Sequence, residues 1–295
     1  MTDHPDSNTC YRHPDRQSFV LCQRCGRTIC GECQTPAPVG VICPECMREA
    51  RASMPRTRPE AVRRIGYLSR SGQPVMTYAL MAICVFVFIL QQIPGLGSHV
   101  TQALWYAGAY SHPDREAALY GVSFQPWRLL TSVFAHGGFL HVALNMYTLW
   151  VFGQILEPMI GKWRYLTLFL ISGVFGSVGM LVLAAPNQPA VGASGAIFGM
   201  FGTLLVLQRK LGGPIRQLLV LIIINLALGF FPIFGGNIAW QAHVGGLAGG
   251  LLVGLVLAET RKLSQQRLQA GLLGVLGVVA VAAGIYPVLL GGAAG

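Results

Sequence analysis

The sequence predicts an all-α membrane protein that is preceded by a small, metal-stabilised domain. Of its 295 residues, 53% are hydrophobic and only 11% are charged, whereas soluble domains carry about 25% charged residues. Apolar runs long enough for helices begin at residue 74 and recur through the rest of the chain. Seven of the eight cysteines lie before residue 47, so a polar, Cys-rich unit precedes the apolar part.

Seven membrane-spanning helices are expected in the apolar part. Hydrophobic runs bounded by charges, Gly or Pro place them at residues 75–93, 138–156, 163–183, 194–208, 216–230, 239–258 and 269–290. The fourth helix is too short to cross a bilayer core, and the segment before it, 184–193, is uncharged and contains two prolines. We expect domains at 1–50 (metal-binding), 51–73 (basic linker), 74–260 (six-helix core) and 261–295 (additional helix and C-terminus).

The distribution of positive charge predicts topology rather than nucleic-acid binding. The net charge is +10, but 19 of the 21 Lys and Arg residues fall in segments that alternate onto one membrane face. Cytoplasmic loops of membrane proteins carry this excess. We therefore expect a multi-pass protein of the lipid bilayer, in a bacterial cell membrane, with a cytoplasmic N-terminus and no nucleic-acid partner.

Four ligand pairs in the first 50 residues indicate two zinc ions. Each pair is separated by two residues: Cys10 and His13, Cys22 and Cys25, Cys30 and Cys33, Cys43 and Cys46. Eight ligands suffice for two tetrahedral sites, which would supply folding energy where apolar residues are few. A disulfide framework is the rival interpretation. The odd number of cysteines, the paired spacing and the predicted reducing compartment disfavour it.

Two ways of sharing the pairs between the zinc ions are open. A cross-brace would join the first pair with the third and the second with the fourth, and we favour it over sequential pairing because the unit resembles B-box-type zinc modules. Both zinc ions would be structural, and no metal is expected in catalysis. The unit could bind a protein partner or position the rest of the chain.

Three polar residues share one expected depth in the membrane. His141, Ser194 and His243 each lie near the start of an apolar run, and the first charge after that run follows 15 or 16 residues later. At about 1.5 Å per helical residue they lie about 22–24 Å from one membrane face. They are thus inside a hydrocarbon core about 30 Å thick, close to the opposite, outer face. Buried polar groups at such a depth indicate a functional site.

The residue types at this level suit nucleophilic acyl transfer. Ser194 is the candidate nucleophile and His243 the candidate general base. His141 and Asn145 are four residues apart on one helical face and would donate hydrogen bonds to the oxyanion, together with the backbone N–H of Ser194. No Asp or Glu lies at this depth, which favours a Ser–His dyad over a triad. Taken singly, each residue is more often explained by packing or interhelical hydrogen bonding.

Three separated motifs resemble the rhomboid intramembrane serine proteases. They are WRLLTSVFAHGGFLHVALNMYTLWVFG (127–153), GASGAIFGMFG (192–202) and AHVGGLAGG (242–250). The resemblance covers residues 75–258. It implies a six-helix core that cleaves transmembrane protein substrates near the outer membrane face. The implied roles are nucleophile for Ser194, base for His243 and oxyanion donors for His141 and Asn145.

The resemblance also implies roles outside the dyad. Trp127 and Arg128 would have a structural role in the loop after the first helix, and Glu157 would brace the inner end of the second. Phe198 stands where the family often has a Tyr that packs on the base, and we expect little effect from this difference. The seventh helix places the chain in the six-plus-one variant.

Two further expectations stay open at this stage. His136 is more typical of a polar residue at a helix cap than of a catalytic group.

A catalytically inactive membrane binding protein, or a transporter that uses the same polar layer, is the alternative function. Inactive relatives typically lose the Ser or the His, and transporters more often show internal repeats or intramembrane carboxylates. The sequence therefore favours the peptidase.

Overall fold

The computed structural model describes residues 8–37, 39–53, 73–111, 121–229 and 239–287, and the chain divides into two compact units, residues 1–66 and 67–295. Most of the predicted basic linker, residues 54–72, lies outside the described residues, as does the end of the predicted seventh helix beyond residue 287. The two units are described separately because each has its own core.

The first unit consists of two small hairpins and one helix. Strand β1 (Thr9–Cys10) pairs antiparallel with β2 (His13–Gln17), and β3 (Thr35–Pro36) pairs antiparallel with β4 (Val41–Ile42). A single 3₁₀ turn (Gly31–Cys33) and helix α1 (Pro44–Ser53) complete it. The buried apolar residues of this unit are six cysteines and Ile29. Such a core is too small to stabilise a domain by hydrophobic burial alone.

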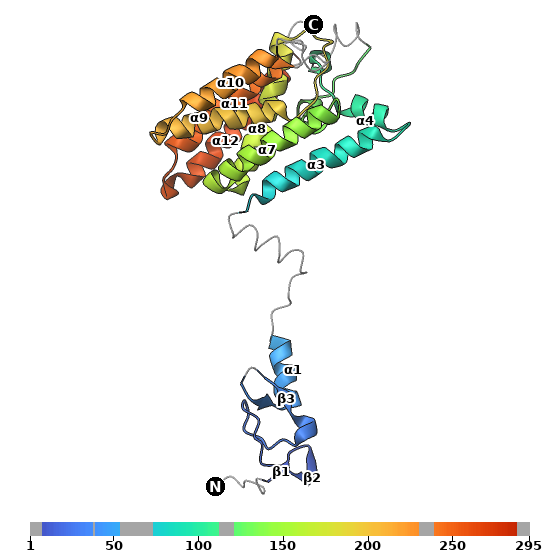
Figure 1. Cartoon of the computed structure of the whole chain (residues 1–295), viewed down its shortest axis with the longest axis vertical. Helices are drawn as coiled ribbons and strands as arrows, with labels where there is room; N and C mark the ends of the chain where they lie inside the picture. Colours follow the sequence, from blue (N-terminus) through green and yellow to red (C-terminus); the bar gives the residue numbers. More distant parts are fainter. Residues whose placement is uncertain (1–7, 38, 54–72, 112–120, 230–238, 288–295) are drawn as a thin grey trace. The chain divides into compact units, whose positions relative to one another are not determined.

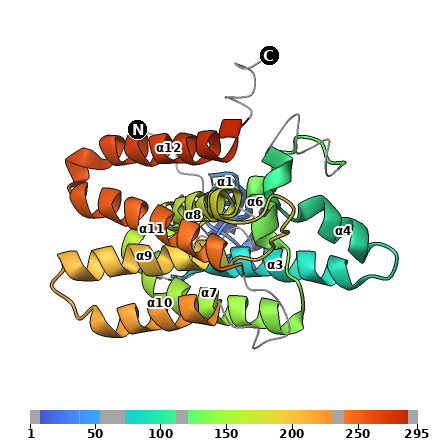
Figure 2. The same cartoon turned by 90° about the horizontal axis from the view of Figure 1, so that it is seen from above.

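The second unit is a bundle of helices (Figure 1). Its long helices are α3 (Val75–Gln92), α7 (Phe139–Ile160), α8 (Lys162–Leu183), α9 (Ser194–Lys210), α10 (Arg216–Leu228), α11 (Trp240–Glu259) and α12 (Gln266–Gly284). Shorter elements are the helices α4 (Gly97–Leu104) and α6 (Arg128–Thr131) and the 3₁₀ turns Gly108–Ser111, Ser132–Phe134 and Leu263–Gln265. Helices α10 and α12 lie on opposite sides of this bundle (Figure 2).

All seven predicted helices are present, with ends that differ by a few residues from the sequence-based bounds. Among the described residues, five segments are long and apolar enough to cross a membrane: α3, α7, α8, α11 and Leu263–Gly284, which includes α12. Helix α9 has 17 residues and α10 has 13. The prediction that the fourth helix is short is confirmed. The chain is thus an integral, multi-pass membrane protein, with an all-α helical unit and a small first unit that contains the four strands.

Glycines hold α9 and α11 against each other. A Cβ on Gly246 would lie 1.9 Å from the carbonyl oxygen of Gly195, and one on Gly250 would lie 1.9 Å from that of Gly199. No side chain fits at such distances, so these two pairs of glycines, each spaced four residues apart, let the two backbones touch. This contact fixes where the N-terminal ends of the two helices stand relative to each other.

Glu157 ties the C-terminal part of α7 to the start of α3. Its carboxylate accepts hydrogen bonds from the backbone N–H groups of Met76 and Thr77, at 2.8 and 2.7 Å, and from the Thr77 hydroxyl at 2.8 Å. The first N–H groups of a helix have no partner within the helix. Glu157 therefore caps α3 from a different helix, and the predicted bracing role is confirmed.

Arg128 organises the loop between α3 and α7. Its Nε donates to Gln125 Oε1 at 2.6 Å, and one terminal nitrogen donates to the carbonyl oxygens of Gln102 and Trp105 at 2.5 and 2.8 Å. The guanidinium also lies 4.0 Å from the ring centroid of Tyr110. These contacts give Arg128 the predicted structural role and leave its neighbour Trp127 exposed.

Candidate active site and metal centres

Ser194 is the first residue of α9, and backbone hydrogen bonds fix the loop before it against the rest of the helical unit. Ala190 and Tyr106 exchange two backbone hydrogen bonds, at 2.7 and 3.0 Å, and the N–H of Gly192 donates to the carbonyl of Ser132 at 2.9 Å. Gly192 has a φ of +127°, which side-chain-bearing residues rarely adopt. The non-helical segment 184–193 is therefore tied to the protein by its backbone, although most of its residues stay partly or fully exposed and only Ala193 is buried; Ser194 at its end is half-buried.

His243 lies on α11 beside the first turn of α9. Its ring is buried and stacks on Phe198, with centroids 4.2 Å apart and planes inclined by 12°. The carbonyl oxygen of Ala242, the preceding residue, lies 3.2 Å from the position of a Cβ on Gly195, the residue after Ser194. Phe198 follows Ser194 by one helical turn. Ser194 and His243 thus come from two helices in direct contact, and Phe198 keeps the predicted ring packing.

The ring of His243 has no carboxylate partner among the described residues. Among the described residues its Nδ1 has no hydrogen-bond partner. Within the same part of the chain, Ser194 Oγ and His243 do not form a hydrogen bond. A third, carboxylate member would be expected to accept a proton from Nδ1.

His141 presents one ring nitrogen to the Ser194 region. Its Nδ1 accepts a hydrogen bond from the backbone N–H of Gly137 at 3.3 Å. In the neutral imidazole the proton is then on Nε2, which becomes a donor. A Cβ on Gly192 would lie 2.7 Å from this Nε2 and 3.8 Å from Ser194 Oγ. His141 Nε2 and Ser194 Oγ therefore both lie close to the space that a side chain at position 192 would occupy.

Asn145 lies one turn further along α7 and is buried. Its Nδ2 donates to the carbonyl of His141 at 2.8 Å. The second amide proton remains available because an amide NH₂ group carries two. The structure thus brings His141, Asn145, Ser194 and His243 to one end of the bundle from three helices.

His136 does not have the role that the sequence favoured. The N-cap of α7 is Gly138, no side chain caps the helix, and His136 is only 2% exposed. Its ring packs edge-on against His141 at 5.2 Å, and neither ring nitrogen has a partner among the described residues. The helix-cap interpretation is therefore wrong. The backbone N–H of His136 donates to Gln91 Oε1 at 3.0 Å, a contact between α3 and the loop before α7 that sequence spacing does not reveal.

Gly192 is a site residue that the sequence did not single out, although it opens the GASG motif. Its positive φ and its closeness to the His141 ring show that only glycine fits there. The sequence feature that could have pointed to Gly192 is its place two residues before the candidate nucleophile.

The first group of potential metal ligands comprises Cys10, His13, Cys30 and Cys33, whose ligand atoms lie within 4.8 Å of one another. His13 Nδ1 is 3.3 Å from Cys30 Sγ, 3.5 Å from Cys33 Sγ and 3.8 Å from Cys10 Sγ. Zinc–sulfur bonds of about 2.3 Å in a tetrahedron separate the ligand atoms by about 3.8 Å. The spacing suits a shared ion.

The second group comprises Cys22, Cys25, Cys43 and Cys46. Cys25 Sγ and Cys43 Sγ are 3.8 Å apart, far beyond the about 2.05 Å of a disulfide. The backbone N–H of Cys43 donates to Cys22 Sγ at 3.1 Å, as expected where a sulfur carries negative charge. The groups join the first pair with the third and the second with the fourth, as in a cross-brace.

Electrostatics in the second group show why it suits a cation. Burial, followed by the neighbouring thiols of Cys43, Cys25 and Cys22, raises the pKa of Cys46 to about 12. Four thiols packed together cannot all ionise without a compensating positive charge. A divalent ion supplies that charge, so the donor set fits zinc.

Comparison with known proteins places the helical unit in a family. The family model described as Rhomboid domain matches residues 123–260. Rhomboid protease GluP of Bacillus subtilis (strain 168) is 36% identical over 196 residues, which are 64% of this chain and 36% of GluP. Putative rhomboid protease YdcA of the same organism is 33% identical over 139 residues, 46% of this chain and 69% of YdcA.

A third relative supports the same assignment. Rhomboid protease GlpG of Yersinia enterocolitica is 29% identical over 197 residues, 64% of this chain and 66% of GlpG. The residues matched by the family model include the helices α7, α9 and α11, which carry the candidate site. This chain belongs to the rhomboid family. It spans only about a third of the length of GluP.

Proposed function

We propose that this protein is an intramembrane serine endopeptidase that cleaves transmembrane proteins near the outer membrane face. Its catalytic residues are Ser194 and His243, assisted by His141 and Asn145. The observation that carries the proposal is the convergence of these four polar residues, from three helices, around the half-buried start of α9. Membership of a family whose relatives are named as proteases supports it.

The chemistry follows from the atoms that meet at Ser194. His243 Nε2 takes the hydroxyl proton as Oγ attacks the substrate carbonyl, which gives a tetrahedral intermediate with a negative oxygen. His141 Nε2–H, the second amide proton of Asn145 and the backbone N–H of Ser194 stabilise that oxygen. The proton then passes from His243 to the leaving amine. Water then hydrolyses the acyl-enzyme. His243 takes a proton from the water as its oxygen attacks the ester carbonyl, and returns the proton to Ser194 Oγ as the ester bond breaks.

The depth of the site limits the substrate. A peptide bond in a transmembrane helix has its carbonyl engaged in the helix, so the substrate must unwind locally before Ser194 can attack. The opposite end of the bundle carries the positive charges of Lys162, Arg164, Lys210 and Lys262. We propose that this end is cytoplasmic, that the membrane is bacterial and that the site faces outward. Reporter fusions after residues 53 and 287 should then report opposite sides.

A fluorophosphonate probe tests the catalytic proposal. We expect wild-type protein in detergent to be labelled on Ser194, and expect Ser194→Ala and His243→Ala to lose both labelling and cleavage of a transmembrane substrate. Ser177→Ala is a matched control, because this serine bonds the carbonyl of Leu129 at 2.8 Å and has no proposed catalytic role. Unlabelled, folded wild type whose substrate cleavage survives Ser194→Ala would refute the proposal. Solute uptake that survives Ser194→Ala would favour a transporter.

The first unit is proposed to be a structural zinc domain of residues 1–50, joined by a linker of residues 51–73 to a catalytic core of 74–260 and an additional segment of 261–295. The two ligand groups support two zinc ions per chain. Elemental analysis of purified full-length protein should give two zinc ions. Cys22→Ser should remove one of them and His13→Ala the other. Retention of both ions in these variants would contradict the assignment. A protein that binds this domain is a further proposal, testable by crosslinking.

A further inference from the structure

The ring of His141 is oriented by the loop that precedes α7, residues 135–138. In this loop the backbone N–H of Gly137 donates to His141 Nδ1 at 3.3 Å. That distance is at the long end for a hydrogen bond, so a small displacement of the loop would break it. A neutral imidazole carries its proton on either nitrogen, and this bond favours the form with the proton on Nε2. The position of the loop therefore decides what His141 can donate near Ser194.

Gln91, next to the last residue of α3, holds this loop from a different helix. Its Oε1 accepts a hydrogen bond from the backbone N–H of His136 at 3.0 Å. His136 and Gly137 are consecutive, so their N–H groups belong to neighbouring planar peptide units that one pair of backbone torsions joins. The buried ring of His136, packed edge-on against His141, restricts the same residue further. Fixing the His136 N–H thus fixes where the Gly137 N–H points.

Helix α4 fixes the amide group of Gln91 in turn. Gln91 Nε2 donates to Thr101 Oγ1 at 2.9 Å, and the Thr101 hydroxyl donates to the carbonyl of Gly97 at 2.9 Å. A Cβ on Gly97 would lie 1.9 Å from the carbonyl oxygen of Gln91, so the backbones of α3 and α4 touch there. An amide side chain, with an acceptor on one atom and donors on the other, satisfies both of its neighbours.

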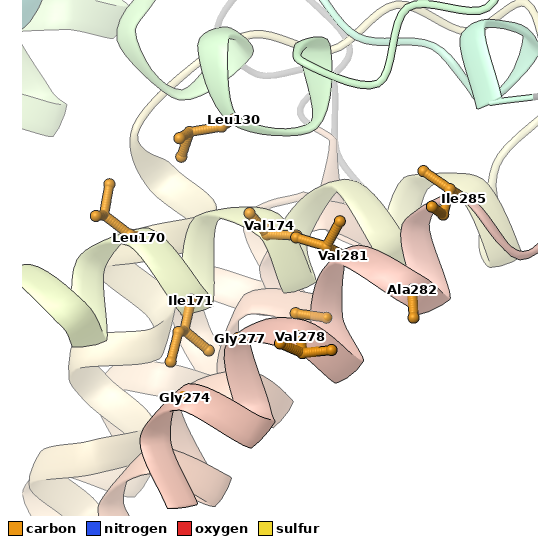
Figure 3. Close-up of a pocket in the computed structure, with 11 residues that line it drawn as sticks. Leu130, Leu170, Ile171, Val174, Gly274, Gly277, Val278, Val281, Ala282 and Ile285 are labelled. Carbon is orange, nitrogen blue, oxygen red and sulfur yellow. The ribbon is translucent and has the colours of Figure 1, made fainter. Parts of the chain in front are cut away.

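The connection that leads to this loop also borders an apolar hollow. Leu130 of α6 lines a space of about 600 Å³ between α8 and α12, where it faces aliphatic side chains such as Val174 and Val281 (Figure 3). The residues that line this hollow are aliphatic or glycine, so their side chains offer no hydrogen bond. The side-chain hydrogen bond that the loop does receive from another helix is the one from Gln91 on α3.

We infer that Gln91 is a positioning residue of the proposed oxyanion site and acts through His136 and Gly137 on the ring of His141. The inference rests on the proposed peptidase function, in which His141 Nε2–H is an oxyanion donor. Gln91 lies outside the three helices that carry the candidate catalytic residues. Its loss lets the loop shift, and His141 then populates the form whose unprotonated Nε2 repels a negative oxygen.

Gln91→Met tests this relay, because it removes both hydrogen bonds of the amide and keeps the length of the side chain. We expect the rate of fluorophosphonate labelling of Ser194, and the kcat for a transmembrane substrate, to fall about tenfold, while KM stays within about twofold. Gln92→Met is the matched control, since Gln92 is the exposed next residue and should tolerate the change. Gln91→Glu should restore most of the rate, because a carboxylate still accepts from the His136 N–H while the Thr101 hydroxyl turns to its other oxygen.

Nitrogen NMR of full-length protein labelled with ¹⁵N-histidine reports the His141 tautomer without any activity. The protonated and unprotonated nitrogens of a neutral imidazole give well-separated signals, and His141→Gln identifies the pair that belongs to His141. We expect the proton on Nε2 in the wild type and in Gln91→Glu, and a mixture of tautomers in Gln91→Met. Thr101→Val, which only frees the Gln91 amide, should give a smaller shift and is the milder variant if Gln91→Met fails to fold.

Two results would overturn the relay. One is a wild-type tautomer and wild-type kcat in Gln91→Met, even if its Tm falls, because Gln91 would then only join α3 to α4. The other is equal losses in Gln91→Met and Gln92→Met. If wild-type protein is not labelled on Ser194 at all, the peptidase proposal fails, while the nitrogen spectra still decide whether Gln91 sets the tautomer of His141.

Discussion

The ring of His141 can donate toward Ser194 because two backbone segments fix it. The N–H of Gly137 occupies Nδ1, which puts the proton on Nε2, and the missing side chain of Gly192 leaves room for that nitrogen. Oxyanion donors act by being in place before charge develops. At the scale of single residues, the site therefore depends on a glycine that makes no chemical contribution of its own.

Gly192→Ala should strongly impair the peptidase. The new Cβ would lie 2.7 Å from His141 Nε2, and a φ of +127° is strained for alanine. We expect fluorophosphonate labelling of Ser194 to slow by at least about tenfold. Gly212→Ala provides the control, because Gly212 also has positive φ, +73°, but its Cβ meets nothing within 4 Å. Equal rates for the two variants would show that strain alone, and not the His141 contact, matters.

Asn145→Ala should lower turnover more than substrate affinity. The lost amide donor acts mainly on the negative oxygen of the transition state, and such deletions cost about a hundredfold in kcat. Steady-state cleavage of a transmembrane substrate in proteoliposomes measures both constants. Unchanged kcat with a raised KM would instead indicate a substrate-binding role.

At the scale of elements, polar side chains at helix ends add to the apolar packing between the helices. Glu157 is 3% exposed and caps α3, while Lys210 and Glu259 join the ends of α9 and α11 by an exposed ion pair of 2.5 Å. A buried carboxylate with three donors contributes far more than an exposed pair, which is worth about 0–1 kcal/mol.

Glu157→Ala should therefore destabilise the bundle clearly more than Glu259→Ala. Removing Glu157 leaves two buried N–H groups of α3 and one hydroxyl unpaired, at about 1–3 kcal/mol for an unsatisfied group. Thermal unfolding in detergent measures both variants. Similar Tm values for the two would show that the cap is dispensable.

At the scale of the whole molecule, the two units have unrelated sources of stability. The first has a core made almost entirely of potential metal ligands, whereas the second has an extensive core of apolar side chains and close backbone contacts. Metal removal should act on one unit alone.

A zinc chelator should unfold the first unit and leave the peptidase site intact. We expect release of zinc and exposure of seven reactive cysteines, while fluorophosphonate labelling of Ser194 in the same full-length protein stays within about twofold. Cys84 is buried in α3 and serves as an internal control for the thiol reagent. Loss of labelling in parallel with zinc would show that the units are coupled.

The sequence by itself determined which segments are helices, because apolar runs, charges and Gly or Pro boundaries are local signals. It also predicted the ligand pairs and, through three motifs, the four candidate catalytic residues. Only the tertiary structure decided the tautomer of His141, the burial of His136 and the need for glycine at Gly192. Each of these depends on atoms from segments far apart in the chain, and packing between such segments has no local pattern.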